Sequence, residues 1–598
     1  MKKSIITPLF IVLTSCMSMG LFSCSDFFET PRSVTFDEDS IFSRLEYAQR
    51  LMNQVYSGTP KTINNDWGDR LYGNSPECIT DLAAGFMGQE KHSSHRFNLA
   101  QLTTEMGSAT GWSDALNGGE YMYQWTCIRY AHILLDRVDE IPDATEAQKE
   151  RIRGECNLIL AWHHFEMWRR FGGIPLIKKR LDNAEDQKIQ RSTLKDSYDY
   201  IIELLDKAIH NPYLPVKSEG VEFGRVNKAF AYALKAKVKL YAASPLFNTG
   251  DPYISLGEHN DLICFGQYDI NRWKEAADAA TEAINFCEQN GYAIVENQAT
   301  SGDNYLTATT KTPSNGNTEI IQGWQQLMSG VGINQFLPRG TNFSGWQGTV
   351  PTHNLVEMYR KTDGSFIDWS SPITTSVNNP AEPFKDLEPR FQMSVAHNGS
   401  QWITGNGAYA LQYWNSPNGT SGGAESPAVS KAEYSYVTWK YTHGYENIRK
   451  VPVNWWFVHV NMRLAEIYMI RAEAMNEFSG PSEQVKKDLN KVLNRSGMSV
   501  PESAMSSPQA MRVFIERENA IEFFLEDHRY LDLKRTLRSM DILNFDAVDA
   551  RCVKNSNNTY TYTRTVVQHR YFLKKYYLWP FTQNEINKDY GLIQNPGW

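Results

Sequence analysis

One short segment of the chain matches the letters of a hydrolase motif. Residues 419–423 read Gly-Thr-Ser-Gly-Gly, which fits the G-x-S-x-G nucleophile elbow. That motif activates its serine only where a strand turns sharply into a helix. The flanking residues 416–418 and 424–427 are Ser, Pro, Asn, Ala and Glu, a composition typical of a flexible loop. We therefore expect no catalytic serine here.

A metal centre is the second chemistry to consider. His163 and His164 lie near Glu166, but the chain has no H-E-x-x-H motif and no second carboxylate–histidine motif at helical spacing. We interpret the two histidines as a packed or solvated pair. The cysteines that follow Cys24 have no C-x-x-C spacing, so neither a metal nor a cofactor is expected; they are Cys78, Cys127, Cys156, Cys264, Cys287 and Cys552.

Three glutamates at helical spacing could serve as an acid/base set. Glu518, Glu522 and Glu526 follow one another every four residues, with Arg517, Arg529 and Asp532 beside them. Alternating charges at this spacing form ion pairs more readily than an active site, and we predict an ion-pair network between helices. Carboxylates that cleave glycosides meet only in the fold, and nothing in the sequence requires them. We therefore predict that the protein is not an enzyme.

The elements that must position any site are mostly paired amphipathic helices. Apolar residues recur at three- and four-residue steps over 121–138, 149–171, 194–209, 229–241 and 271–287. Helix-turn-helix units of this size resemble divergent tetratricopeptide repeats, which stack into a curved scaffold.

The helical pattern lapses after residue 290 and returns near residue 456. The intervening stretch is rich in Gly, Asn, Ser, Thr and Pro, yet it holds several tryptophans, which argues against disorder. Helices resume over 461–478, 485–493 and 511–525. The sequence thus predicts a mostly α protein with a large irregular insertion on one face, divided into an N-terminal helical part (24–290), the insertion (291–455) and a C-terminal helical part (456–598).

The first residues are typical of an export signal. Lys2 and Lys3 precede a short apolar stretch over 5–13, and Leu-Phe-Ser-Cys follows at 21–24. The apolar run is too short to span a bilayer. The Leu-Phe-Ser-Cys segment resembles the lipobox of bacterial lipoproteins, so we expect a signal peptide over 1–23 and acylation of Cys24; Cys16 is the second choice. The excess of 68 acidic over 60 basic residues argues against a nucleic-acid partner.

Several segments of the chain resemble sequence blocks of one known protein family. Residues 463–475 contain Leu-Ala-Glu-Ile-Tyr and Arg-Ala-Glu-Ala, and 518–535 resemble the family's E-R-x-x-E-x-x-x-E-G-x-R-W-x-D-L-x-R pattern. Residues 578–598, from Leu-Trp-Pro-Phe to Gln-Asn-Pro-Gly-Trp, resemble the family's C-terminus closely. Weaker blocks occur at 171–176 and 351–356. Asn519, Asp527 and Tyr530 stand where the family usually has Arg, Gly and Trp, which puts the packing of that helix in doubt.

This resemblance, to the SusD/RagB family of outer-membrane nutrient-binding lipoproteins, implies a lipid-anchored, surface-exposed protein of the outer membrane. Such a protein pairs with a SusC-like TonB-dependent transporter and acts as its lid, delivering oligosaccharide or polysaccharide. The helical scaffold would dock on the transporter, and the irregular face would bind ligand. Three alternatives stay open: a peptide binder of the RagB type, a structural lid without ligand affinity, and a glycosidase.

Tryptophans in irregular segments are the candidate ligand-binding residues. A flat indole can cover the C–H face of a sugar ring, and by analogy with base stacking each such platform contributes roughly 1–3 kcal/mol. Trp324 and Trp346 lie in a Gly- and Asn-rich stretch that precedes Pro351. Trp67 and Trp112 come from the N-terminal half and could complete a cleft against them. All four stand where the resemblance places such platforms, and core packing is the alternative for each.

Overall fold

The computed structural model describes residues 38–60, 76–85, 93–105, 125–181, 188–328, 333–340, 343–404, 407–443 and 455–598. The predicted signal peptide with Cys16, the acylation site Cys24, and the candidate platforms Trp67 and Trp112 lie outside these ranges. Within them, no helix is both long and apolar enough to cross a membrane.

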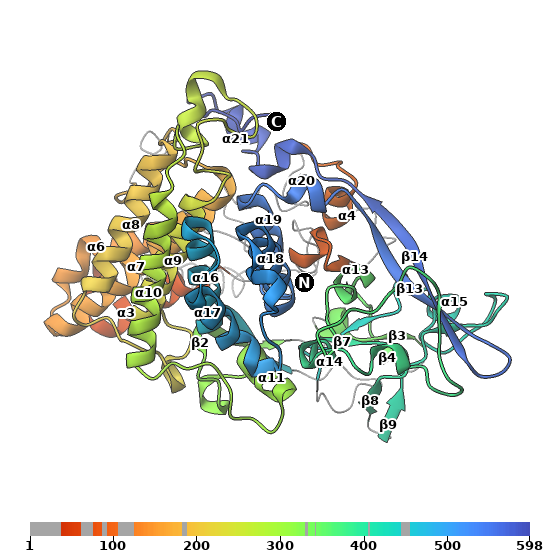
Figure 1. Ribbon diagram of the computed structural model, residues 1–598. Coiled ribbons are helices and arrows are strands. Elements are labelled where there is room, and N and C mark those ends of the chain that lie inside the picture. Colours follow the sequence, from red (N-terminus) through yellow and green to blue (C-terminus); the bar gives the residue numbers. More distant parts are fainter. Residues whose placement is uncertain are drawn as a thin grey trace, which may run out of the picture.

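Stacked helices form one side of the molecule (Figure 1). Each of them contacts the next in the order α3, α6, α7, α8, α9, α10, α16, α17. This is the predicted mostly α scaffold of helical pairs. Its helices are, with the short α2 ahead of them, α2 (Glu38–Phe42), α3 (Leu45–Ser57), α6 (Trp125–Arg137), α7 (Glu146–Phe171), α8 (Leu194–His210), α9 (Lys228–Ala243), α10 (Asn271–Gln289), α16 (Leu464–Ser479) and α17 (Glu483–Leu493).

Local sequence signals explain where the scaffold helices begin and end. Helix α7 starts three residues before the predicted position because Thr145 and Gln148 form a capping box. It ends at Phe171, where Gly172 adopts a φ of 81° that favours glycine. The small residues Ala229, Ala233 and Ala236 of α9 are fully buried, as expected for two helix backbones that pack closely.

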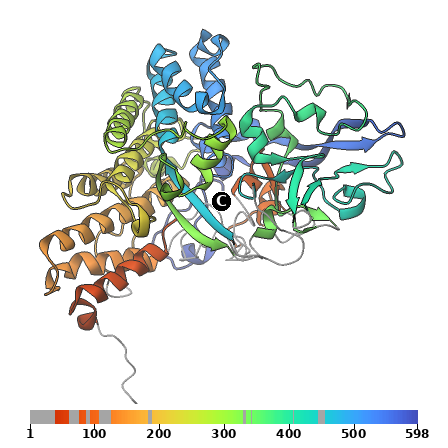
Figure 2. The same ribbon diagram turned by 90° about the horizontal axis from the view of Figure 1, so that it is seen from below.

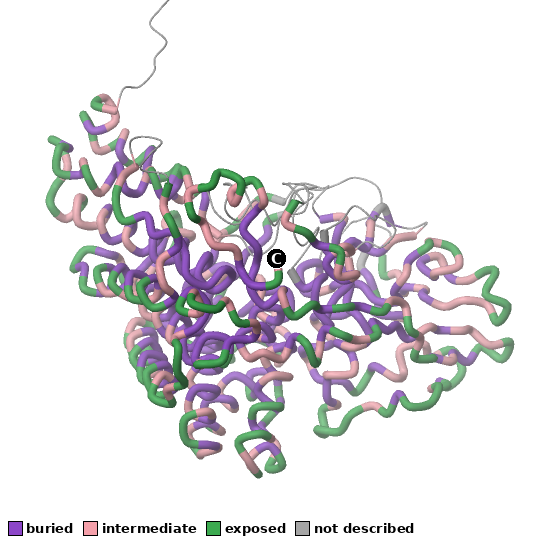
Figure 3. The backbone as a smooth tube through the Cα atoms, turned by 90° about the horizontal axis from the view of Figure 1, so that it is seen from above, coloured by how far each residue is buried: buried purple, intermediate pink, exposed green. Residues whose placement is uncertain are grey.

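The insertion is more ordered than its sequence suggested. It holds most of a second hydrophobic core, which includes Trp369, Trp402 and Phe391 and extends to Ile521 and Tyr562 of the C-terminal part. Buried stretches therefore run through both the helices and the insertion (Figure 3). The insertion and its neighbours contain α11 (Ser301–Thr310), α13 (His353–Val356), α14 (Pro389–Ser394), α15 (Pro427–Ser430), β2 (Ile320–Met328), β3 (Arg339–Gly340), β4 (Phe343–Ser344), β5 (Thr349–Pro351), β6 (Ile373–Thr374), β7 (Val395–Ala396), β8 (Gln401–Thr404), β9 (Gly407–Ala410), β10 (Trp414–Asn415) and β11 (Val437–Thr438).

Two long strand pairs join the insertion to the rest of the chain. Strand β2 pairs antiparallel with β12 (Trp455–Arg463), which leads directly into α16. This ribbon lies between the helices and the smaller strands (Figure 2). Residues 461–463, expected to be helical, therefore belong to a strand. Near the C-terminus, β13 (Phe545–Lys554) and β14 (Tyr560–Arg570) form a hairpin flanked by β10 and β6 of the insertion.

The remaining helices and strands lie in the N-terminal and C-terminal parts, and all of them except α18 are short. They are β1 (Ala83–Gly85), which pairs with β5, and the helices α4 (Ser93–Asn98), α18 (Pro508–Glu522), α19 (Arg529–Arg535), α20 (Ser539–Ile542) and α21 (Gln583–Ile586). The helix predicted over 511–525 has the right length but begins and ends three residues earlier, at Pro508 and Glu522. It ends at Glu522, because Leu525 and Asp527 adopt left-handed backbone angles that break it.

A buried ion-pair network lies where the scaffold meets the insertion, as predicted for the three glutamates. Glu518 pairs with Arg390 at 2.7 Å, and Glu526 pairs with Lys440 at 2.7 Å. The third, Glu522, accepts hydrogen bonds from arginines of three different segments, namely Arg390, Arg463 and Arg495. Two other residues that were predicted to belong to this network have different partners. Arg529 pairs with Asp81, and Asp532 pairs with Arg535.

Candidate ligand-binding site

Trp324 and Trp346 lie on different parts of the insertion. Trp324 is half-buried on β2 and stacks on His459 of β12, with ring centroids 4.2 Å apart and planes 4° from parallel. One face of its indole is therefore covered by the protein. Trp346 is half-buried between β4 and β5, and its backbone N–H donates to the carbonyl of Asn334 at 2.8 Å.

The outer face of the β2–β12 ribbon carries an exposed tryptophan that the sequence reasoning missed. Trp456 is 59% exposed and stands opposite Leu327, which is 43% exposed. It borders a pocket of about 340 Å³ whose polar lining includes Lys311, Asn315 and His443. Phe457 and His459 are buried on one face of β12, which places Trp456 on the opposite face. Val458 on that opposite face is also buried, so the alternation of the strand alone could not predict that Trp456 is exposed.

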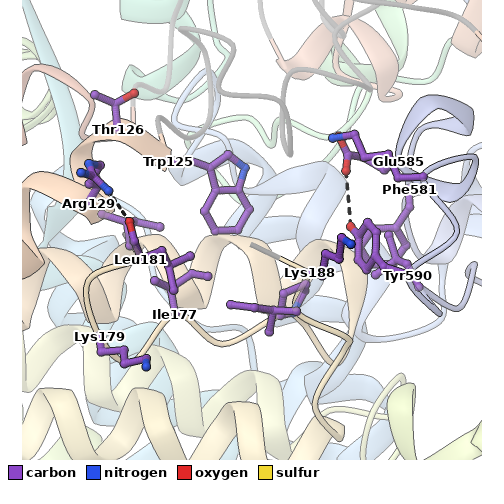
Figure 4. A pocket seen from close by; sticks show the side chains of 15 residues that line it. Trp125, Thr126, Arg129, Ile177, Lys179, Leu181, Lys188, Phe581, Glu585 and Tyr590 are labelled. Atoms are coloured by element: carbon purple, nitrogen blue, oxygen red, sulfur yellow. Dashed lines mark hydrogen bonds and ion pairs between the residues drawn. The ribbon is translucent and has the colours of Figure 1, made fainter. Parts of the chain in front are cut away.

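A larger pocket, of about 810 Å³, opens between α6 and the C-terminal segment. Trp125, the first residue of α6, is half-buried and reaches into it. Figure 4 shows its indole on one side, with Phe581 and Tyr590 on the other. The sequence placed Trp125 on the buried stripe of its helix. Ile128 and His132 of that stripe are buried as expected, but the end of the helix that carries Trp125 opens on the pocket.

Short-range hydrogen bonds shape the C-terminal wall of this pocket. Thr582 caps α21 by accepting from the backbone N–H of Glu585. The Glu585 carboxylate accepts from the Tyr590 hydroxyl at 3.3 Å and pairs with Lys588 at 2.7 Å. Burial, with Glu585 beside it, raises the pKa of Tyr590 to about 12. The phenol therefore keeps its proton at neutral pH.

Arg191 links the end of α7 to the C-terminal segment that forms one wall of the pocket. Its buried guanidinium donates to the carbonyls of Gly173 and Phe171, at the end of α7, and to that of Ile593 in the C-terminal segment. It also lies 5.0 Å from the centre of the Phe581 ring. The bond to Ile593 joins residues 402 positions apart in sequence, so this wall of the pocket is in place only in the folded chain.

The lining of the pocket suits a polyhydroxylated ring. Trp125, Phe581 and Tyr590 offer flat apolar surface, and Arg129, Lys179, Lys188, Glu585 and Lys588 offer donors and acceptors. Large apolar surface with a few convergent polar groups is typical of small-ligand sites.

The residues that the sequence analysis considered for catalysis do not line this pocket. Ser421 is exposed, and its carbonyl accepts from the N–H of Ser416 at 2.8 Å. In sequence, β10 ends six residues before Ser421 and α15 begins six residues after it. The strand-to-helix arrangement of a nucleophile elbow is thus not formed there. Burial lowers the pKa of His163 to about 3 and that of His164 to about 4, so both are neutral. The described part of the chain contains no group of three or more His, Cys, Asp or Glu side chains suited to a metal ion.

Comparison with known protein families assigns most of the chain. Residues 289–598 match the sequence model of the SusD family. Residues 77–240 match a second model, described as starch-binding associating with outer membrane. A curated relative, the SusD-like protein P38 of Formosa agariphila, is 22% identical over 437 residues, which is 71% of this chain and 74% of that protein.

Solved structures share the whole fold at low sequence identity. A SusD-like protein from Bacteroides fragilis is 23% identical, with a TM-score of 0.75 over 94% of this chain and 99% of that one. A laminarin-binding SusD-like protein is 16% identical, with a TM-score of 0.58, and covers 93% of this chain and 100% of its own. A surface glycan-binding protein A from Bacteroides fluxus is 15% identical, with a TM-score of 0.59 over the same shares.

Proposed function

The chain belongs to the SusD family, and from this premise we propose that it is a non-catalytic glycan-binding protein of the cell surface. It captures oligosaccharide or polysaccharide and passes it to a partner TonB-dependent transporter. Support comes from the second family model, whose description couples starch binding with the outer membrane. Two of the structural relatives are named for laminarin or surface glycan binding.

The observation that carries the proposal is the Trp125 pocket. A sugar ring stacked on the indole would meet hydrogen-bonding groups on the opposite wall, including Glu585 and Tyr590. Each stacked ring contributes roughly 1–3 kcal/mol. Two or three such contacts give dissociation constants from about micromolar to millimolar once ordering costs are subtracted. That range suits a protein that must release what it captures.

The tryptophans predicted from sequence remain proposed platforms. They are Trp67 and Trp112, which lie outside the described residues, Trp324 in the middle of β2, and Trp346 between β4 and β5. Trp324 can offer one indole face at most, because His459 covers the other. At least two of the four alanine variants are expected to keep the parental melting temperature yet lose glycan binding. Loss of stability in step with affinity in all four would show that these indoles belong to the core.

We further propose a lipid anchor at Cys24 and a SusC-like partner. The acylated cysteine would hold the protein on the outer membrane, since each buried methylene contributes about 0.8 kcal/mol. The stack from α3 to α17 offers an extended surface for the transporter.

A glycan array tests the binding function directly. The chain from Ser25 to Trp598 is applied to a panel of plant, algal and microbial oligosaccharides, and the same mixtures are assayed for newly formed reducing ends. We expect saturable binding to a restricted set of glycans without product formation. Binding to peptides alone would favour the RagB-type alternative. Product formation that disappears on a single carboxylate substitution would make the protein a glycosidase.

A further inference from the structure

We propose that the Trp125 pocket selects anionic saccharides, those whose rings carry carboxylate or sulfate, over neutral ones. This inference rests on the proposed glycan-binding function and adds the class of ligand. It comes from the charges that line the pocket, which differ in sign from the charge of the chain as a whole.

Among the residues that the structure describes, four cationic side chains and one carboxylate line the pocket. The cations are Arg129, Lys179, Lys188 and Lys588, and the carboxylate is Glu585. The chain as a whole carries a formal net charge of −8. A cationic lining in an acidic protein is therefore a local feature, and it attracts anions that the rest of the surface repels.

Two of the cations keep their charge available to a ligand. Lys588 is offset by Glu585, at 2.7 Å. By contrast, Arg129 donates to the carbonyl of Leu181, a neutral acceptor (Figure 4). Throughout the described ranges, neither Arg129 nor Lys179 has a carboxylate within 4.0 Å, and both are exposed to solvent. Many other surface cations of this protein do have such partners, among them Lys195, Lys207 and Lys274.

The position of Arg129 relative to the aromatic platform explains how charge would be recognised. Arg129 follows Trp125 by four residues on α6. Side chains at this spacing lie on the same helix face, with Cβ atoms about 5–6 Å apart. A ring stacked on the indole can therefore direct its carboxylate or sulfate to the guanidinium, which binds such groups through two parallel hydrogen bonds. Lys179 reaches the same pocket from the segment that follows α7.

Matched pairs of charged and uncharged oligosaccharides test the proposal. The probes are galacturonate oligosaccharides with their fully methyl-esterified forms, and sulfated galactan oligosaccharides with their desulfated forms. These probes are assayed together with the neutral glycans of the array. We expect the charged member to bind at least tenfold more tightly, about 1.4 kcal/mol. This preference should shrink between 0.05 and 0.5 M NaCl, roughly the range over which the screening length falls from above 10 Å to below 8 Å. The two pairs also distinguish carboxylate from sulfate recognition.

A charge-removing variant assigns the preference to this pocket. The double substitution Arg129→Gln with Lys179→Gln should lower affinity for the charged probe about tenfold and leave neutral glycans unaffected. The matched control is Lys487→Gln, an exposed lysine of α17 outside the pocket. Equal binding of charged and neutral probes, or an unchanged preference in the double variant, overturns the inference but not the proposed function. Absence of binding to every saccharide overturns both.

Discussion

At the scale of single residues, the structure explains a departure of this chain from its family's pattern. Asp527 stands where the family usually has glycine, and its φ is 62°. Left-handed angles cost an L-residue roughly 1–2 kcal/mol, less for Asp and Asn than for other types. The Asp527 carboxyl is also buried, and burial raises its pKa. Arg170, its partner at 3.5 Å, already binds Glu166.

Asp527→Gly should therefore stabilise the protein by about 0.5–1 kcal/mol, since relief of strain and of the buried charge exceeds the entropy cost of glycine. Because the pKa of Asp527 is raised in the folded protein, its ionised carboxyl destabilises the folded state above that pKa. Below the unfolded pKa the carboxyl is protonated in both states, and this penalty is absent. The gain should thus be larger at pH 7 than at pH 3. Urea unfolding of the parent and the variant at pH 7 and at pH 3 measures the gain in stability and its pH dependence. Asn558→Gly is the matched control, because Asn558 has a φ of 60° but is exposed. A loss of 1 kcal/mol or more in Asp527→Gly would mean that the carboxyl contact with Arg170 dominates.

Trp125 shows what a residue pattern can and cannot predict. The spacing of Trp125, Ile128 and His132 predicted an amphipathic helix, and that helix is present. The pattern could not show that one end of the stripe opens on a pocket, because the opposite wall comes from residues 581–592. Hydrophobic periodicity is local, whereas the walls of this pocket meet only through long-range contacts.

At the scale of elements, the buried ion-pair network fixes how α18 meets β12 and α14. Glu522 receives hydrogen bonds from arginines on three segments, and each of these arginines is buried. Burial alone would raise the pKa of Glu522, but the charges of Arg495, Arg463 and Arg390 hold this pKa below its usual range. Four-residue spacing was enough to predict such a network. It could not identify Arg390 and Arg463, which come from other parts of the chain.

Glu522→Gln should destabilise the fold by about 3–5 kcal/mol, because it leaves three buried guanidinium groups short of negative charge. The folded pKa of Glu522 is lowered, so its contribution is present above the unfolded pKa and is lost as pH falls below it. The difference between parent and variant should accordingly narrow at acidic pH. Denaturant unfolding at pH 7 and pH 4 provides the measurement. Glu502→Gln, which removes an exposed partner of Lys486, should cost less than about 1 kcal/mol. A cost of Glu522→Gln as small as that of the control would contradict the role given to the network.

At the scale of the whole molecule, the helical scaffold is continuous in space, although the insertion interrupts it in the sequence. Helix α10 precedes the insertion and α16 follows it, yet the two pack together in one stack. Helical periodicity predicted every member of the stack from α6 onward. The insertion was harder to predict because its strands are mostly two to four residues long and pair across long stretches of sequence. The buried aromatic residues of the insertion and the exposed Trp456 of β12 cannot be told apart in the sequence.

The lipid anchor leads to a prediction for the molecule in its cell. Cys24→Ala should move the protein from the membrane fraction to the soluble fraction in folded form, because the acylated residue is the proposed attachment point. Fractionation followed by immunoblotting measures this. Release by Cys16→Ala instead of Cys24→Ala would move the processing site to the earlier cysteine.

The affinity of Trp125→Ala for the tightest-binding glycan of the array tests the central claim most directly. Removal of one stacked ring should weaken binding about tenfold to a hundredfold. The unfolding free energy should change by less than about 2 kcal/mol because the side chain is only half-buried. Trp273→Ala, a buried core residue outside the pocket, should instead cost about 3–5 kcal/mol of stability. Parental affinity in Trp125→Ala, or affinity lost only in proportion to stability, would contradict the assignment of glycan binding to this pocket.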